Sequence, residues 1–114
     1  MNERVNILGT EYVIRHVNTD ACTLLGESSG ICDSSTKTIW IKDNGEPTPE
    51  TKQNLEYVEK KVLRHEIIHA FMYESGLAEN SNDIDQWAED EELIDWIAIQ
   101  SPKMLKAFEE AGAL

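Results

Sequence analysis

His65, Glu66 and His69 are the residues best suited to chemistry, because they set two imidazoles one helical turn apart with a carboxylate beside the first. Residues four apart share a face of a helix, so the two histidines can each direct a ring nitrogen at one Zn²⁺, at about 2.0 to 2.1 Å. Glu66 points off that axis and suits a general base that acts on a metal-activated water. This H-E-x-x-H spacing therefore predicts two zinc ligands and a catalytic base.

One long helix, residues 48–76, is expected to carry this motif. Thr48 suits the N-cap, Pro49 the first helical position and Gly76 the C-terminal stop. Steps of three and four residues predict an inward-facing stripe made of Leu55, Val58, Val62, His65, His69 and Tyr73. Polar groups brought to a buried face need a partner, and a metal ion is the simplest one.

A catalytic zinc site normally takes a third protein ligand and leaves its fourth position to water. The metzincin continuation of the motif is ruled out, because Met72 and Ser75 stand where it has glycine and histidine. His16 lies in an alternating segment and is expected to be an exposed strand residue. A carboxylate is therefore the better candidate for the third ligand.

A second helix, expected at residues 87–100, offers that carboxylate in its acidic first turn. Glu91 is favoured as the ligand, because it shares a face with Ala98, whose small side chain allows close approach of the two helices. Glu92, on a neighbouring face, is the alternative. Asp95, one turn further on, could hold a ligating histidine through its second ring N–H. The other acidic residues of this turn are expected to be solvated and stabilised by the helix dipole.

Two further features have two interpretations each. Tyr73, one turn beyond His69, could donate its hydroxyl to a developing oxyanion as a catalytic residue, or it could be a packed tyrosine with a satisfied hydroxyl. Residues 38–42 form the clearest strand, with Ile39 and Ile41 on one face. As an edge strand beside the metal it could pair with an extended peptide, whereas the plainer alternative is a protected edge that ends in Lys42.

The motif and its surroundings resemble a minimal gluzincin, similar to the small phage and prophage metallopeptidase-like proteins related to the ImmA/IrrE family. The similarity covers roughly residues 30–100: H-E-I-I-H at 65–69, an aromatic residue at 73, and a segment at 91–98 similar to the family's E-x-x-A-[ND]-x-F-A helix. Residues 30–33 and 38–41 are similar to the strands before the long helix there and in SprT-like proteins. The resemblance implies zinc held by His65, His69 and Glu91, with Glu66 as the base.

Length and charge limit the number of domains and the kinds of partner that we expect. The 114 residues are expected to form one domain, 1–114, and the formal net charge is −12. Eight acidic residues and no basic one lie between residues 79 and 95: Glu79, Asp83, Asp85, Glu89, Asp90, Glu91, Glu92 and Asp95. Such a field repels nucleic acids and anionic membranes, so neither is expected as a partner. It could favour basic or unfolded protein segments, or serve solubility alone.

The sequence has no membrane-span-length apolar run and no signal-peptide core at its start, so a cytoplasmic location is expected, in the host cytoplasm if a phage encodes it. Cys22 and Cys32 are then expected to remain thiols, with a disulfide between them as the alternative.

The expected fold class is α+β. Strands at residues 5–8 and 11–17, a short strand at 22–25 and the strand at 38–42 are expected to form a small, mostly antiparallel sheet against the motif helix. The ligand-bearing second helix should follow, with a break at Ser101 and Pro102 and a short C-terminal helix to Ala111.

These observations predict a zinc metallopeptidase that acts on a peptide or protein substrate, with Glu66 as general base. The alternative is a non-catalytic, zinc-stabilised module that binds another protein. The sequence does not determine the oligomeric state.

Overall fold

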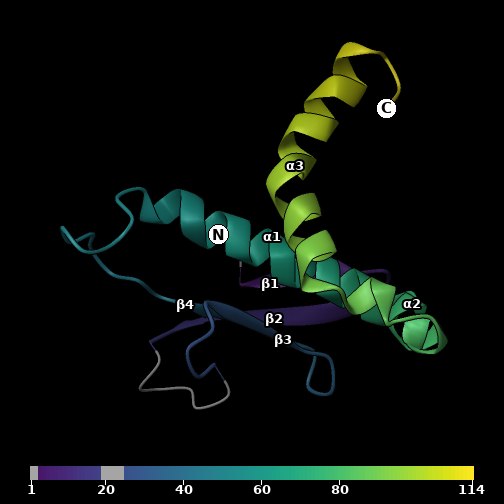
Figure 1. Cartoon of the computed structure of the whole chain (residues 1–114), viewed down its shortest axis with the longest axis horizontal. Coiled ribbons are helices and arrows are strands. Elements are labelled where there is room, and N and C mark those ends of the chain that lie inside the picture. The colour runs from purple at the N-terminus through teal and green to yellow at the C-terminus, as the bar shows by residue number, and fades with distance from the viewer. Residues whose placement is uncertain (1–2, 19–24) are drawn as a thin grey trace.

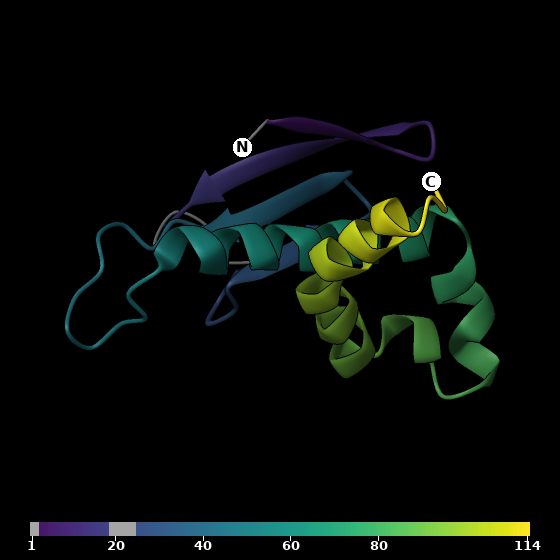
Figure 2. The same ribbon diagram turned by 90° about the horizontal axis from the view of Figure 1, so that it is seen from above.

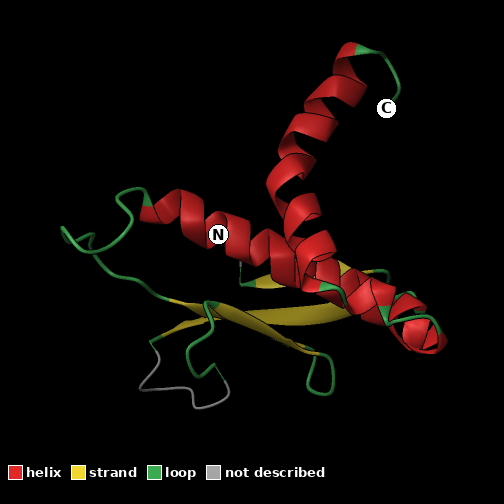
Figure 3. Cartoon of the chain, in the orientation of Figure 1, coloured by secondary structure: helices red, strands yellow, loops and turns green. Residues whose placement is uncertain are grey.

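The computed structural model describes residues 3–18 and 25–114 and has an α+β fold. Helix α1 crosses one face of a four-stranded sheet, and α3 projects from the side of α1 that faces away from the sheet (Figure 1, Figure 3). The elements are β1 (Arg4–Ile7), β2 (Thr10–Val17), β3 (Gly30–Asp33), β4 (Thr38–Lys42), α1 (Leu55–Glu74), α2 (Leu77–Asn80) and α3 (Glu91–Glu110), with short 3₁₀ turns at Ser81–Asp83 and Trp87–Glu89.

The sheet is mixed, with strand order β1-β2-β4-β3, so the expectation of a mostly antiparallel sheet was wrong. β1 and β2 form an antiparallel hairpin, β2 and β4 are parallel, and β3 and β4 are antiparallel. The parallel pair arises because the chain crosses over after β2 and makes β3 before it returns as β4 (Figure 2). β4 is therefore an interior strand and β3 is an edge strand, which corrects the expectation that residues 38–42 form an edge.

The core lies between the sheet and α1. Alternation along the strands turns one face toward the helix, and β4 contributes Ile39 and Ile41 as expected, both fully buried. Tyr12 from β2 is also fully buried, and Val62 and Ala70 contribute from α1. This packing holds the middle of α1, which carries the histidine motif, against the sheet.

α1 begins at Leu55, seven residues after the expected N-cap. The side chain of Asn54 caps it by accepting a hydrogen bond from the Tyr57 N–H at 3.1 Å. Thr48 instead belongs to a separate turn, in which its carbonyl oxygen accepts hydrogen bonds from the Thr51 N–H and the Gln53 side chain. These local hydrogen bonds compete with a helical start. The predicted end is confirmed, because Gly76 follows with a left-handed φ of 86°.

α3 is one continuous helix through Pro102, so the predicted break and the separate C-terminal helix were wrong. Its start is also later than predicted, since Asp90 is the N-cap and accepts a hydrogen bond from the Glu92 N–H at 3.2 Å. Proline cannot donate to the carbonyl four residues earlier, which is that of Ala98. The Nε–H of Arg64 on α1 donates to this oxygen at 2.7 Å instead. A side chain from α1 thus satisfies the group that proline would leave without its helical partner.

Residues 19–24 lie outside the described residues, so the prediction about Cys22 and most of the predicted strand at 22–25 fall there. Leu25, the described end of that predicted strand, lies in a turn. Among the described residues, no helix combines the length and apolar character that a membrane crossing needs.

Candidate metal centre

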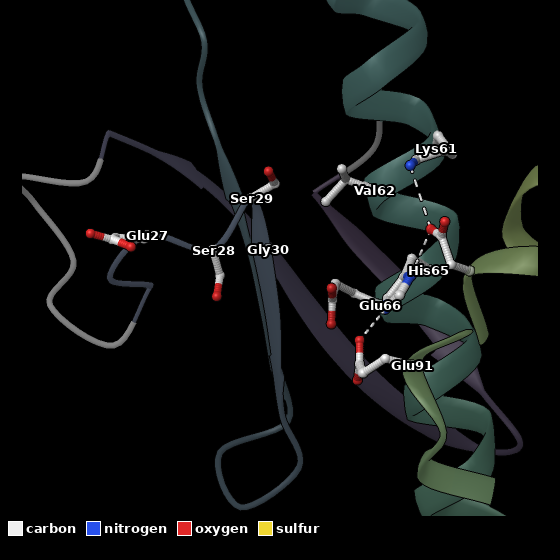
Figure 4. A pocket seen from close by; sticks show the side chains of 10 residues that line it. Glu27, Ser28, Ser29, Gly30, Lys61, Val62, His65, Glu66 and Glu91 are labelled. Atoms are coloured by element: carbon white, nitrogen blue, oxygen red, sulfur yellow. Dashed lines mark hydrogen bonds and ion pairs between the residues drawn. The ribbon is translucent and has the colours of Figure 1, made fainter. Parts of the chain in front are cut away.

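Three side chains that could bind a metal ion meet between α1 and α3. His65 and His69 lie on successive turns of α1, and Glu91 begins α3; one potential ligand atom from each lies within 4.8 Å of the others. The Glu91 carboxylate approaches both rings, with Oε2 at 2.9 Å from Nε2 of His65 and Oε1 at 2.7 Å from Nε2 of His69. The two predicted histidines and the favoured third ligand are therefore brought together. Figure 4 shows the contact between His65 and Glu91.

Asp95 holds His65 from the other side. Its Oδ1 lies 3.2 Å from Nδ1 of His65, as expected for a carboxylate one turn beyond the ligand. Lys61 also approaches this oxygen, at 3.4 Å. Burial acts to raise the pKa of Asp95, but the contacts with His65 and Lys61 outweigh it and hold that pKa below its ordinary value. Asp95 is thus a carboxylate placed to hold the orientation of the His65 ring and to accept a proton from Nδ1.

The donor set fits a cation. Nε2 of His65 lies 2.9 Å from Oε2 of Glu91, so in the tautomer that carries its proton on Nδ1 the two electron-pair donors would repel unless a proton or metal ion lay between them. Burial lowers the pKa of His69, which favours the neutral, ligand-competent ring. Nδ1 of His69 is buried and has no hydrogen-bond partner among the described residues. Two imidazoles and one carboxylate match the ligand type of open zinc sites.

Glu66 is buried to the same degree as His69, with 7 % of each residue exposed. It points from α1 toward the chain segment that carries Ser28 and Gly30, with Glu91 nearby (Figure 4). Burial raises the pKa of Glu66 to about 7, and the charge of Glu91 adds to this while His65 opposes it. The carboxyl group therefore changes protonation state close to neutral pH, as a proton-transfer group must.

Gly30, at the start of β3, allows the sheet edge to approach Glu66. A Cβ at this position would lie 2.7 Å from Cγ1 of Val62 and 3.1 Å from Cγ of Glu66. The first distance is shorter than carbon atoms adopt and the second is tight, so a side chain here would displace Val62 or move β3 away from α1. Because glycine has no side chain, the edge strand β3 can lie close to the Glu66 side chain.

Two cavities adjoin the cluster, and both are lined by Glu66 and Glu91. The first, about 400 Å³, extends past Lys61, Asp95 and the 27–30 segment. The second, about 240 Å³, is bounded by β3, His69 and Tyr73. Cys32 of β3 lines the second cavity, and burial, with Glu66 and Asp33 nearby, raises the pKa of this thiol to about 12. The thiol is therefore protonated at neutral pH.

The remaining predicted residues lie as follows. Tyr73 packs against His69, with ring centroids 6.3 Å apart and the rings nearly parallel, and burial raises its pKa. It lines the second cavity, a position compatible with either interpretation of this residue. Glu92 is exposed and lies outside the cluster, and His16 is exposed on β2 as predicted.

Sequence reasoning did not single out Gly30, Lys61 or the 27–30 segment as part of the site. A glycine at a strand start is compatible with many roles, and Lys61 has no motif around it. The useful signal for Lys61 was its position four residues before His65, which places it on the same face of α1.

Comparison with family models, with curated proteins and with solved structures finds no match to this chain.

Proposed function

We propose that this protein is a zinc-dependent peptidase of the gluzincin type, with His65, His69 and Glu91 as metal ligands and Glu66 as general base. The observation that carries the proposal is the convergence of both Nε2 atoms on the Glu91 carboxylate while Glu66 lies buried beside them. When bound, the zinc ion would polarise a substrate carbonyl and lower the pKa of water at the site toward about 7.

Residues of the chain would transfer the proton, orient His65 and align the substrate. Glu66 would take a proton on its carboxylate from the attacking water and return it to the leaving amine, which its pKa of about 7 allows at neutral pH. Asp95 would hold the His65 ring through Nδ1. The edge strand β3 borders both cavities, so its free backbone groups could align an extended peptide beside Glu66.

The test uses wild-type protein and three variants: Glu66→Gln, His69→Ala and, as a matched control on an exposed carboxylate of the same region, Glu92→Gln. Elemental analysis would measure bound zinc, and release of fragments from fluorescently labelled denatured casein would measure cleavage. Wild type and Glu92→Gln should bind one zinc ion per chain and cleave. Glu66→Gln should keep the zinc but lose about 10²- to 10⁴-fold in rate, and His69→Ala should lose both.

Three outcomes separate the possible functions. Equal cleavage by Glu66→Gln and wild type would contradict Glu66 as the base. Zinc binding without any cleavage would favour the alternative, a zinc-stabilised module that binds another protein. Absence of zinc binding in wild type would reject both.

A further inference from the structure

Lys61 is the one lysine or arginine among the described residues that line the two cavities beside the cluster. It precedes His65 by four residues, so both side chains lie on the same face of α1 and line the first cavity, of about 400 Å³. Only 24 % of the Lys61 side chain is exposed. A chain with a net charge of −12 thus places a single, largely covered ammonium group in the wall of this cavity.

The ammonium group of Lys61 has hydrogen-bonding capacity left for a ligand. It carries three N–H donors, and among the described residues the structure gives it one acceptor, Oδ1 of Asp95 at 3.4 Å. This contact is longer than the roughly 2.7 to 2.9 Å of a strong charge-assisted hydrogen bond. At least two donors therefore remain for a molecule that occupies the cavity.

The acidic side chains around the same cavity are less available to a cation. Glu91 places one carboxylate oxygen against each histidine. Asp95 contacts both His65 and Lys61. Glu27, on the opposite wall, points its side chain away from α1 (Figure 4). A negatively charged acceptor is therefore the group that best complements the Lys61 end of the cavity.

The position of Lys61 along α1 sets how far such an acceptor would lie from the proposed reaction. Lys61 precedes Glu66 by five residues, which corresponds to about 7.5 Å along the helix axis. An extended peptide covers this length in about two residues, at roughly 3.3 Å each. A substrate whose scissile bond lies beside Glu66 could thus bring a carboxylate to Lys61 from a neighbouring residue.

We propose that Lys61 determines specificity, in that its ammonium group binds a carboxylate of the substrate within about two residues of the peptide bond that is cleaved. An aspartate or glutamate side chain or the C-terminus of the substrate supplies this carboxylate, and the recognition chemistry is the same for both. The inference rests on the proposed function, since it names the substrate class of the site that contains Glu66. Lys61 thereby gains a role in substrate binding beyond its contact with Asp95.

The first test identifies the bonds that the protein cleaves in denatured casein. Zinc-loaded wild type is incubated with the casein, and mass spectrometry identifies the fragments. Recognition of an acidic side chain should place Asp or Glu at one fixed position within two residues of the cut, whereas recognition of the C-terminus should release short C-terminal pieces of any sequence. Lys61→Met should lose either pattern. Lys60→Met, at an exposed neighbour paired with Glu56, is the matched control and should keep it.

The second test separates substrate binding from support of Asp95. A peptide built on a preferred site, and its counterpart with the carboxylate replaced by an amide, are titrated by calorimetry into zinc-loaded Glu66→Gln protein, with zinc content measured for every variant. The acidic peptide should bind about tenfold more tightly, the effect of one charge-assisted hydrogen bond. Adding Lys61→Met should remove this difference, and Lys61→Arg should retain part of it because the positive charge remains.

Each other outcome overturns the inference in a recognisable way. Cleavage of casein without selection for a carboxylate, or with selection for lysine or arginine, would reject it and leave the proposed peptidase standing. Absence of cleavage by the zinc-loaded wild type would reject both. An equal loss of affinity for the acidic and the amide peptide on Lys61→Met replacement would also reject it, because Lys61 would then act only through Asp95.

Discussion

At the scale of single residues, Asp95 lies outside the proposed ligand set but contacts one of its members. It contacts Nδ1 of His65 at 3.2 Å and is itself approached by Lys61. If Asp95 accepts the Nδ1 proton of His65, the Nε2 lone pair of this ring faces Glu91. Its role followed from its place one turn after Glu91, so this part of the site was predictable from helical spacing alone.

Asp95→Asn should weaken zinc binding by about 10- to 100-fold, because the amide can leave His65 in the wrong tautomer or orientation. Competition with a chromophoric chelator would measure the affinity. Glu92→Gln, one turn earlier and exposed, serves as the control and should bind zinc as wild type does. Equal affinities for Asp95→Asn and wild type would remove Asp95 from the site.

Gly30→Ala should destabilise the protein by about 1 to 3 kcal/mol, because the added methyl group overlaps Val62 and presses on Glu66. Urea denaturation would measure the free energy of unfolding. Ser29→Ala, at the exposed neighbouring position, should change it little. A second replacement, Val62→Ala, should recover part of the loss in the Gly30→Ala background; if it deepens the loss additively instead, the overlap is not the cause.

At the scale of elements, features set by local interactions were predictable from the sequence, and features set by contacts between distant segments were not. The end of α1 at Gly76 and the buried face of β4 depend on local conformation and alternation, and both were predicted. The start of α1 was not, because Thr48 and Asn54 are both good N-cap residues and only the folded chain decides between them. At Pro102, where α3 continues, the donor to the Ala98 carbonyl comes from Arg64, which is 34 residues away in sequence, so no local pattern indicates it.

Pairing of the strands was the least predictable feature. Antiparallel hairpins follow from short turns, such as the one between β1 and β2. The parallel pairing of β2 with β4 requires a crossover and the insertion of β3 at the edge, and no local pattern specifies it. For the same reason residues 38–42 were expected to be an edge strand, in one of two interpretations beside a metal ion, whereas β3 is the edge strand that lines the cavities next to Glu66 and Glu91.

Glu74, at the end of α1, ties that helix to the sheet and predicts an acid-dependent stability. It accepts hydrogen bonds from the Tyr12 hydroxyl at 2.7 Å and the Lys37 ammonium at 2.6 Å, and these contacts hold its pKa below the ordinary value. A lowered pKa in the folded state stabilises the protein above the unfolded pKa of about 4.5, and this stabilisation disappears as the pH falls through the folded value.

Glu74→Gln should therefore reduce the free energy of unfolding at pH 7, and the difference from wild type should shrink as the pH falls below about 4.5. Urea denaturation at a series of pH values would test this. Glu11→Gln, which removes an exposed carboxylate paired with Arg4, is the control and should give a smaller difference at pH 7. A gap that widens toward acid pH would contradict the assignment.

At the scale of the whole molecule, the proposed metal would contribute to stability as well as to catalysis, because a ligand that binds only the folded chain stabilises it. Saturation at about 100 times the Kd corresponds to about 2.7 kcal/mol. Zinc should thus raise the Tm by several degrees, and EDTA should reverse the shift. Thermal unfolding followed by circular dichroism measures it.

This stabilisation should decline below about pH 6, because protons compete with the metal for the imidazoles. His69→Ala should show no zinc-dependent shift at any pH, whereas Glu92→Gln should behave as wild type. A zinc-dependent shift of the same size in His69→Ala would mean that the metal binds elsewhere on the chain.

The positions of the proposed ligands along the chain would give a bound metal a second effect. His65 and Glu91 are 26 residues apart, and between them the chain leaves α1, passes through α2 and two short turns, and returns as α3. An ion bound by both His65 and Glu91 would be a cross-link that closes this loop and lowers the entropy of the unfolded chain, as a disulfide does. Its loss would remove one of several links between α1 and α3, beside those that Arg64 and Lys61 make, so chelation would loosen the contact between the two longest described helices.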